Sequence, residues 1–576
     1  MRKKPSLART LFFTLLLLLI STQLRTFPCL IPEVKAHPNE VTNVDTGLTY
    51  SSIQEAIDAT ETLNGHKISI SPGIYYDQVR IDKSLTLIGS NPKTTIIDGR
   101  GTGTVVRVQA DNVCVENFTI RNSGSNPMLD CGILLDYCFG SRIDNNNVVS
   151  CLYGIYVFHS PNSTLTCNNI SENYEDGLWV YYSGNSTLVK NRISDNRYNF
   201  GLFGGSFSHF DNNITPSNTV DGKPIRYLVD VNDVVIQREM DIGVLYMINS
   251  GNVTVKDLAF TRNGHGLFAW NLTNSLIENI TASENNYGIY LQSSAQNVIA
   301  RNNCPNNWVG ICLQDSDRNV VVNNLTPNNE KGISLYKADR NILTGNTIST
   351  NLYGIRLFAS DFNEAWHNNL IENTEQANLV NSHGNAWDNG FEGNFWSNYN
   401  GSDLNMEGLG GIVYIIDSSN QDCRPLLGTF FDFTARYREH DYNISVVSNW
   451  ALSNFTFEPE SRAIRFSVKN DVESDGFCRM RIPHALMNPN QISVRIDNGL
   501  TDLLHYNNSL FDDGEHRWIY FACQTSPSEI TVIQLRSPLI WWPLFLSLVV
   551  LTACVTAFLV WKRRNSQSPA SRAAKE

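Results

Sequence analysis

Aromatic residues recur at two fixed positions after a series of regularly spaced glycines. The positions lie two and four residues after the glycine, and they hold Tyr156, Phe158, Trp179, Tyr181, Phe203, Phe268, Trp270 and Tyr290. In a strand these positions share one face, here the outward one. An aromatic ring complements the apolar face of a pyranose, so a platform of stacked rings could bind a glycan. Packing beneath a lateral loop or against a second chain explains the same pattern.

Acidic and basic side chains for glycan cleavage do not form a recognisable set. Gly264-His265-Gly266 is similar to a motif of polygalacturonase-like hydrolases, but Gly266 belongs to the regular glycine series, and paired aspartates are absent from the repeats. We therefore expect His265 to be a solvent-facing turn residue. The isolated aspartates are expected to be solvated turn carboxylates, and no catalytic residue is assigned. They are Asp136, Asp176, Asp195 and Asp315.

One segment places oxygen ligands at the spacing of a calcium-binding loop. Asp403, Asn405 and Glu407 alternate before a glycine, as a hard cation prefers. A structural turn is the favoured interpretation, so we expect no cofactor, with calcium as the alternative.

The cysteines and the charge exclude several classes of protein. The twelve cysteines include no Cys-x-x-Cys pair, which argues against zinc ribbons, iron–sulfur clusters and thioredoxin-like centres. Cys478 and Cys523 are the candidates for a disulfide, and buried thiols are the alternative. The net charge is -12 with 17% charged residues, so nucleic acid is not an expected partner.

The spacing of the glycines predicts the fold. A Gly-[Ile/Leu/Val] step recurs every 21 to 24 residues, and Gly222 fills one gap less cleanly; the other glycines are Gly132, Gly154, Gly177, Gly201, Gly243, Gly266, Gly288, Gly310, Gly332 and Gly354. Asparagines keep the same step, among them Asn274, Asn297, Asn319, Asn341 and Asn363. A coil of about 22 residues suits three short strands and three turns, stacked on the next coil at roughly 4.8 Å.

The period also assigns a role to each repeated residue. Ile and Leu one and three residues after each glycine should point inward, and the glycine should suit a tight corner. The aligned asparagines should form hydrogen-bonded ladders. Apolar residues at helical spacing in 51–63 predict a helix that caps the first coil. The chain is thus predicted to be an all-β protein built around a parallel β-helix.

Three short sequences resemble the entry coils of the pectin-lyase-like right-handed β-helix superfamily. They are YSSIQEAIDA at 50–59, ISISPGIYYDQVRI at 68–81 and KSLTLIG at 83–89. The later repeats resemble the NosD-type, or carbohydrate-binding and sugar-hydrolysis, domain, and 393–403 is similar to an exit segment of archaeal surface members. The resemblance covers residues 45–425 and implies a single-stranded right-handed β-helix. The NosD label implies a periplasmic copper-maturation role, but the histidines and methionines are dispersed.

The two ends predict export and a membrane anchor. Basic residues precede the apolar run Leu11–Ile20, so residues 1–36 are expected to be a signal peptide with an uncertain cleavage site. Leu539–Trp561 contains 23 residues without a charge and precedes a basic cluster, which predicts a transmembrane helix and a cytoplasmic tail over 562–576. Between them, 430–535 is predicted to be a β-sandwich-like juxtamembrane module.

The leading functional hypothesis is a single-pass cell-surface protein whose ectodomain lies outside the cytoplasm and binds carbohydrate or contributes to an envelope layer. Its expected partners are an extracellular polysaccharide or envelope components. Repeated Asn-x-Ser/Thr triplets make glycosylation plausible. An extracellular polysaccharide lyase or hydrolase and a NosD-like copper accessory protein remain the alternatives.

Overall fold

The computed structural model describes residues 40–127, 130–238, 240–469, 476–496, 505–523, 529–534 and 542–565. The expected signal peptide, 1–36, lies outside these residues. The chain divides into two compact units, one formed by residues 1–319 with 325–338 and the other by 320–324 with 339–576. The repeats form an all-β right-handed solenoid with coils of about 22 residues, as predicted.

Helix α2, Ile53–Asp58, closes the first coil of the first unit. Ser52 accepts a hydrogen bond from the Glu55 backbone N–H at 3.1 Å, which caps the helix. Ile53, Ala56 and Ile57 are fully buried on the first coil. The predicted cap is therefore confirmed, although it is shorter than the 51–63 segment.

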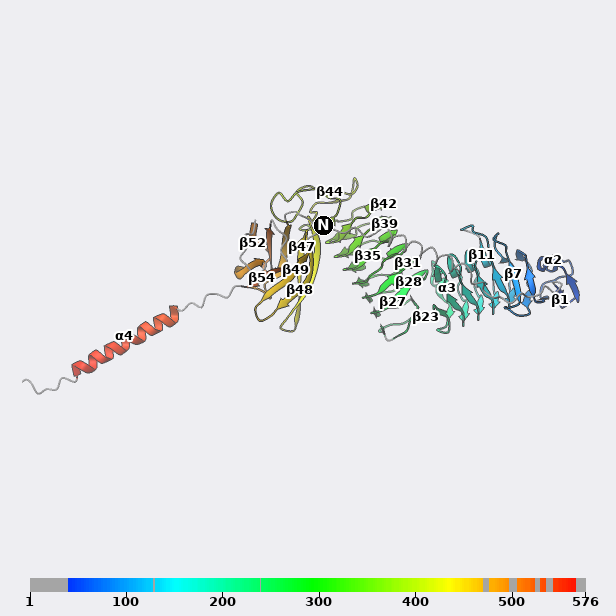
Figure 1. The fold of residues 1–576 in the computed structure, drawn as a ribbon, viewed down its shortest axis with the longest axis horizontal. Coiled ribbons are helices and arrows are strands. Elements are labelled where there is room, and N and C mark those ends of the chain that lie inside the picture. Colours follow the sequence, from blue (N-terminus) through cyan, green and yellow to red (C-terminus); the bar gives the residue numbers. More distant parts are fainter. Residues whose placement is uncertain are drawn as a thin grey trace, which may run out of the picture. The chain divides into compact units, whose positions relative to one another are not determined.

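Each coil of the first stack, residues 40–220, contributes strands to three sheets (Figure 1). The sheet that includes the strands with the repeated glycines is called the first glycine sheet, and it consists of β5 (Val79–Ile81), β8 (Val106–Val108), β11 (Cys131–Asp136), β14 (Tyr153–Phe158), β17 (Asp176–Tyr181) and β20 (Tyr198–Phe203). A second sheet contains β2 (Leu48–Tyr50), β1 (Val41–Asn43), β3 (Lys67–Ile70), β6 (Thr86–Gly89), β9 (Cys114–Glu116), β12 (Arg142–Asp144), β15 (Thr164–Thr166), β18 (Thr187–Val189) and β21 (Asn213–Ile214). A third begins with β4 (Gly73–Tyr75), β7 (Thr95–Asp98), β10 (Thr119–Arg121), β13 (Asn147–Val149), β16 (Asn169–Ser171), β19 (Arg192–Ser194) and β22 (Thr219–Val220).

A hairpin interrupts the solenoid after β22. Strand β23, Lys223–Val229, pairs antiparallel with β22 and then parallel with β25, Val244–Ile248. Gly222 occupies the turn with φ +80°, a conformation that favours glycine. Gly222 is therefore a turn residue rather than a member of the repeated series, which explains its poor fit to the period.

The second stack, residues 223–319 and 325–338, resumes the coils in the first unit. Its counterpart of the first glycine sheet contains β23, β25, β28 (His265–Trp270), β31 (Tyr287–Gln292), β33 (Val309–Gln314) and β36 (Lys331–Tyr336). The other strands are β24 (Val235–Ile236), β26 (Thr254–Lys256), β27 (Ala259–Thr261), β29 (Leu276–Glu278), β30 (Thr281–Ser283), β32 (Val298–Ala300) and β35 (Leu325–Pro327). Tyr287 pairs with Val309 and Val309 with Lys331, so the coil length is 22 residues.

The second unit contains further coils and a two-sheet module. Its coil strands are β34 (Val320–Val322), β37 (Ile342–Thr344), β38 (Thr347–Ser349), β39 (Tyr353–Phe358), β40 (Glu364–Trp366), β41 (Asn369–Ile371), β42 (Glu375–Val380) and β43 (Phe395–Trp396), followed by the hairpin β44 (Tyr414–Ile415) and β45 (Gln421–Asp422). One antiparallel sheet has the order β46 (Thr429–Tyr437), β47 (His440–Ser448), β50 (Gly476–Pro483), β53 (His516–Cys523) and β52 (His505–Asp512). The other has β48 (Ala451–Glu458), β49 (Ala463–Lys469), β54 (Glu529–Gln534) and β51 (Ile492–Ile496).

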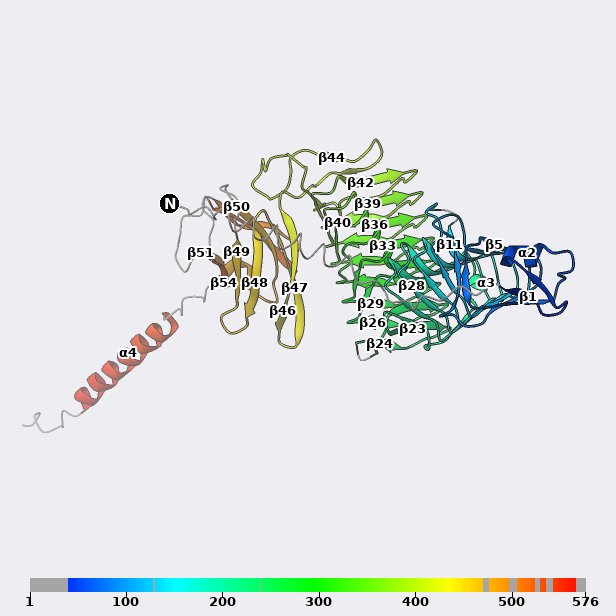
Figure 2. The same ribbon diagram turned by 45° about the vertical axis from the view of Figure 1, so that its right-hand side comes forward.

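Both sheets of this module contribute to one core, as in a β-sandwich. Ile444 and Met480 come from the first sheet and Ile464 and Val532 from the second, and all four are fully buried. The view in Figure 2 shows the long strands of the module.

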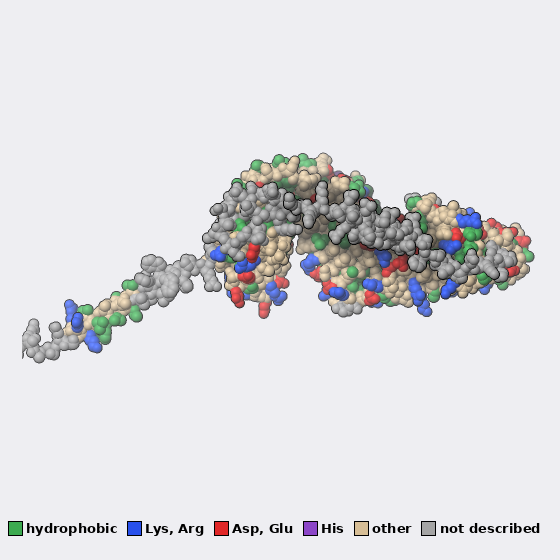
Figure 3. All heavy atoms as spheres, in the orientation of Figure 1, with side chains coloured by type: hydrophobic (Ala, Val, Ile, Leu, Met, Phe, Trp, Pro, Cys, Tyr) green, Lys and Arg blue, Asp and Glu red, His purple; other side chains and the backbone are tan. Residues whose placement is uncertain are grey.

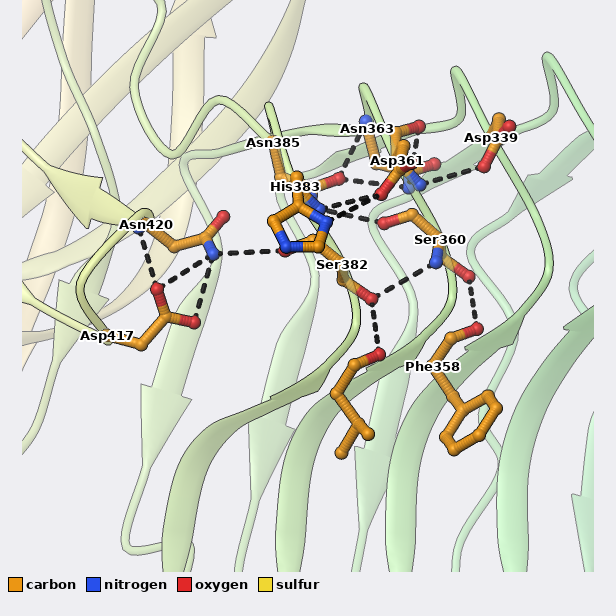
Figure 4. A network of polar contacts seen from close by, with 11 residues as sticks. Asp339, Phe358, Ser360, Asp361, Asn363, Ser382, His383, Asn385, Asp417 and Asn420 are labelled. Atoms are coloured by element: carbon orange, nitrogen blue, oxygen red, sulfur yellow. Dashed lines mark hydrogen bonds and ion pairs between the residues drawn. The ribbon is translucent and has the colours of Figure 1, made fainter.

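The repeated residues of the coils have the predicted inward positions and ladders. Ile155 and Val157 after one glycine are buried, as are Ile289 and Leu291 after another. Buried asparagines donate to one another along the stack: Asn297 Nδ2 lies 3.0 Å from Asn319 Oδ1 and Asn341 Nδ2 lies 3.1 Å from Asn363 Oδ1. Figure 4 shows part of the second unit, where the Ser360 N–H donates to Ser382 Oγ on the next coil at 3.1 Å.

The reason for the repeated glycines differs from the expectation. Gly154 and Gly288 lie inside strands with negative φ, not at corners. A Cβ on Gly288 would lie 2.5 Å from the carbonyl oxygen of Gly310 on the next coil. Glycine is required because the coils approach closely, and corners instead use residues such as Asn162 and Asn185 at φ +59° and +54°.

Helix α4 spans Trp542–Asn565. Part of the expected membrane span, 539–541 and the side chains of 542–548, lies outside what the structure describes. Counted over the described side chains, the structure has no helix that is both long and apolar enough to cross a membrane.

Candidate functional site

Three rings of the first glycine sheet form a column across successive coils. Phe158, Tyr181 and Phe203 occupy matching positions of β14, β17 and β20. Their ring centroids are 5.4 Å apart at both steps, with interplanar angles of 12° and 9°. All three are half-buried, so part of each ring faces solvent. We call this set the inner column.

A second column lies beside it, one residue further along each coil. Tyr137 stacks on His159 at 4.9 Å and His159 on Tyr182 at 5.2 Å. These residues follow the strands with φ of 44° to 51°, and Tyr137 is 67% exposed. The prediction from sequence missed this outer column, although its members lie five residues after Gly132, Gly154 and Gly177.

The other predicted platform residues lie at less accessible positions. Phe268 and Tyr290 are 0% and 1% exposed, so they cannot be part of an exposed platform. Phe210 of helix α3, Phe207–Phe210, covers this region, since its ring lies 5.5 Å from Phe268 and 5.4 Å from half-buried Trp270. Helix α3 thus covers Phe268 and Trp270 from the side.

Two further predicted platform residues, Tyr156 of β14 and Trp179 of β17, lie on the first glycine sheet. Tyr156 is half-buried and lies 5.6 Å from the Phe158 ring. The ring of Trp179 lies over Gly201, where a Cβ would come within 1.9 Å of it. It also stacks on His265 at 5.8 Å. Trp179 therefore packs the junction between the two stacks.

His265 is not the solvent-facing turn residue that the sequence predicted. It is fully buried at the start of β28, and Nδ1 lies 3.1 Å from the Tyr246 hydroxyl. Burial lowers the pKa of His265 to about 3, so the ring is neutral. Strand β20 contacts the turn that precedes His265, because the Gly264 N–H donates to the Phe200 carbonyl at 3.0 Å. The histidine is therefore part of the packing between the stacks.

An open groove of about 620 Å³ lies where the two stacks meet, and we call it the corner groove. From the first stack it is lined by Tyr153, Glu175, Asp176, Arg197 and Tyr198, and from the second by a turn region that includes Trp308 and Glu330. Its size is in the range of ligand-binding sites. The groove joins residues more than 130 positions apart in the chain.

Asp176 is the unusual group in this groove. Its Oδ1 atom is buried and has no hydrogen-bond partner among the described residues. Burial and, to a smaller extent, the neighbouring Glu175 raise the pKa of Asp176 to about 7, and Arg197 opposes the change. Arg197 is committed to Glu175 by an ion pair of 2.6 Å. Asp176 is therefore not the solvated turn carboxylate expected from the sequence.

The opposite side of the groove contains the Glu330 carboxylate, fixed by a hydrogen bond and an ion pair, and the Trp308 ring. Glu330 accepts a hydrogen bond from Trp308 Nε1 at 2.8 Å and pairs with Lys331 at 3.3 Å. The Lys331 ammonium lies 3.6 Å from the centre of the Trp308 ring. Trp308 is 38% exposed, so part of the ring remains accessible in the groove.

The sequence of this chain matches a known family. Residues 58–224 and 211–401 match the model described as "Periplasmic copper-binding protein (NosD)", which covers more than half of the chain. This chain is a member of the NosD family. The two matches meet at 211–224, the region where the β22–β23 hairpin separates the stacks.

Other similarities of this NosD-family chain are more limited. A "Cell surface glycoprotein" of Methanothermus fervidus is 36% identical over 109 residues, which are 19% of this chain and 17% of that protein. The A-module of the mannuronan C-5 epimerase AlgE6 of Azotobacter vinelandii is 15% identical, with a TM-score of 0.28, over 62% of this chain and 98% of its own. The Dettilon tailspike protein gp208 is 15% identical, with a TM-score of 0.23, over 81% and 87%.

The donor groups of this NosD-family chain do not fit a copper site in the part that the structure describes. No three His, Cys, Asp or Glu side chains lie together there in an arrangement that could hold a metal ion. Burial raises the pKa of the Cys151 and Cys304 thiols to about 12, which opposes their use as thiolate ligands.

The proposed calcium and disulfide residues stay predictions in this NosD-family chain. Both oxygens of Asp403 accept backbone hydrogen bonds at 2.8 Å, from the N–H groups of Glu407 and Gly408, which stabilises a turn. Cys478 is buried in β50, opposite Phe521. The Cys523 side chain lies outside the described residues, so their pairing is untested.

Proposed function

We propose that this chain is an exported surface protein that binds a polysaccharide on the outer face of its first glycine sheet. The observation that carries the proposal is the pair of stacked columns, in which six rings lie side by side with part of their surface exposed. Sugar rings stack on aromatic faces, and a regular spacing of rings suits a repeating polymer better than a single small molecule.

Two further observations support this assignment. Lys and Arg side chains and Asp and Glu side chains are interspersed on the face drawn in Figure 3, where the described residues form no extended basic patch. The matched protein of Methanothermus fervidus is named a cell surface glycoprotein, and the family description is periplasmic, which fits an ectodomain outside the cytoplasm.

Removing one ring from each column should weaken polysaccharide binding about tenfold, or 1.4 kcal/mol. We would compare Tyr137→Ala/Tyr181→Ala with the unmodified full chain in mild detergent on a glycan array, then measure affinity by calorimetry. The reason is that each substitution removes a partly exposed ring and leaves the strand backbone in place.

Tyr76→Ala is the matched control, because Tyr76 is 57% exposed but lies outside the columns. Its affinity should equal that of the unmodified chain. Equal affinity in the double variant would reject the columns as the binding face. Absence of binding to every glycan on the array would reject the proposed function.

We also propose that the chain is anchored by α4 together with residues 539–541. The support is the uncharged run Leu539–Trp561, followed by Lys562, Arg563 and Arg564 in the last turn of α4. The full chain should stay in the membrane fraction after an alkaline carbonate wash, whereas a chain ending at residue 535 should be released. Release of the full chain by the wash would refute the anchor.

A further inference from the structure

We infer that the corner groove hydrolyses glycosidic bonds of a neutral or amino-sugar glycan, with Asp176 as the proton donor and Glu330 as the proton acceptor. This inference rests on the proposed polysaccharide binding, because the groove lies at the edge of the same first glycine sheet as the columns. It adds a reaction, a site and a substrate class.

The position of Asp176 suits a proton donor. It is the first residue of β17, immediately before the close-packed glycine Gly177, so its backbone is fixed by pairing with Tyr198 of β20. Its buried Oδ1 lacks a partner among the described residues while the side chain lines an open groove. A buried carboxyl oxygen without a partner favours the protonated form, and the same carboxyl group lies on the lining of the groove, where a glycosidic oxygen would approach it.

Burial, together with the groups that face Asp176, favours its protonated form. The titratable groups that face it are Tyr153 and Tyr156 of β14, Glu175, Arg197, Tyr198 of β20, Cys131 of β11 and Tyr246 of β25. Burial raises the pKa of Tyr153, Tyr198 and Cys131, so these stay neutral. The Arg197 charge is paired with that of Glu175. As the pH rises above 7, Asp176 loses the proton that the reaction needs.

The charges of the groove determine the class of substrate. Its lining includes three carboxyl groups, Glu175, Asp176 and Glu330, whereas Arg197 is the cation among the lining residues and is already paired. A polyuronate would bring its own carboxylates against these acids. A β-elimination on such a substrate also requires a cation that neutralises the uronate carboxylate. Neutral sugars, or amino sugars with a positive charge, fit the groove.

The reaction balances with water as the second reactant. Asp176 transfers its carboxyl proton to the glycosidic oxygen while the bond between that oxygen and the anomeric carbon breaks, and the electron pair of the bond stays on the departing oxygen. Water attacks the anomeric carbon and loses a proton to the Glu330 carboxylate. Glu330 then releases the proton to solvent and Asp176 regains one, so the products are two shorter saccharides. Two carboxyl groups in different environments are the usual requirement for this chemistry.

The test measures cleavage and binding separately. The full chain in mild detergent is incubated with a soluble β-glucan, with chitosan and with polygalacturonate, and new reducing ends and ¹⁸O uptake from labelled water are followed. Cleavage of the glucan or of chitosan is expected, with a rate that falls above pH 7. Asp176→Asn and Glu330→Gln should each lower the rate at least 100-fold with binding within about twofold.

Asp195→Asn is the matched control, since Asp195 is an exposed turn aspartate of the first stack outside the groove. Its rate should be unchanged. Binding of a probe without new reducing ends overturns the hydrolysis but leaves the binding function, whereas no binding of any probe removes the proposed function itself. Unsaturated products from polygalacturonate would identify a lyase and also overturn the inference.

A second measurement tests the proton on Asp176 without a substrate. A carboxyl group with a raised pKa in the folded state contributes stability below its unfolded pKa and loses it as the pH rises through its folded pKa. The melting temperature of the unmodified chain should therefore fall between pH 5 and pH 8.5 relative to that of Asp176→Asn. Parallel pH profiles would show that Asp176 does not hold a proton and would overturn the inference.

Discussion

Replacing Glu392 by alanine is expected to destabilise the second unit by about 3 to 5 kcal/mol. The Glu392 side chain is 8% exposed and accepts a hydrogen bond from Arg479 Nε at 2.7 Å. It also contacts His367 Nε2 at 2.8 Å and Trp518 Nε1 at 3.3 Å. Arg479 is likewise 8% exposed, so its charge would remain buried without its carboxylate partner. Hydrogen exchange of the β50 and β53 amides measures the loss locally.

The same network gives the stability of this unit a defined dependence on pH. Burial by itself raises the pKa of Glu392, but the hydrogen bond with His367 and the charges of Arg479 and His367 outweigh it and lower the pKa to about 2. A lowered pKa means that the stabilisation is complete above about pH 4.5 and is lost as the pH falls toward 2. The Glu392→Ala protein should lack this acid-dependent loss.

An exposed ion pair of equal length provides the control. Glu458 and Arg465 are also 2.7 Å apart, but their side chains are 45% and 35% exposed. Glu458→Ala should leave exchange of the amides unchanged, because exposed pairs contribute little. In Glu392→Met/Arg479→Met both charges are removed, so stability should partly recover. A single variant as stable as the unmodified chain would contradict the assigned role.

Replacing Gly288 by alanine should destabilise the first unit by about 3 kcal/mol or prevent folding. The new Cβ would lie 2.5 Å from the Gly310 carbonyl oxygen, and backbone cannot move aside as a flexible side chain can. The neighbouring coils must separate, which weakens the parallel hydrogen bonds between β31 and β33. The loss of the folded state is followed by thermal unfolding with circular dichroism.

Gly205→Ala tests whether the position or merely the residue type matters. A Cβ there would meet the Tyr182 ring at 3.4 Å, an ordinary contact, and the backbone φ is compatible with alanine. Its unfolding temperature should match that of the unmodified chain. If Gly288→Ala also unfolds at the unmodified temperature, the close approach of the coils does not explain the repeated glycines.

The repeat was predictable from the sequence because each coil contacts only its neighbours. Side chains at the same position in successive coils meet copies of themselves, so Asn297 above Asn319 and Ile289 above Ile311 appear directly as a 22-residue period. The capping helix was predictable for a similar reason, since Ile53, Ala56 and Ile57 are neighbours on one turn. The physical role of the glycines was not predictable, because a close approach between coils gives the same sequence pattern as a tight corner.

The sequence by itself determined the period, the inward residues and the aromatic positions of the first stack, because all of these depend on contacts between adjacent coils. Only the tertiary structure decided which aromatics stay accessible, since helix α3 packs on Phe268 and Trp270, and Phe268 and Tyr290 are both buried. The tertiary structure also determined which residues line the corner groove. Asp176 and Glu330 belong to coils far apart in the repeat series, and they line one groove because the solenoid is interrupted between them.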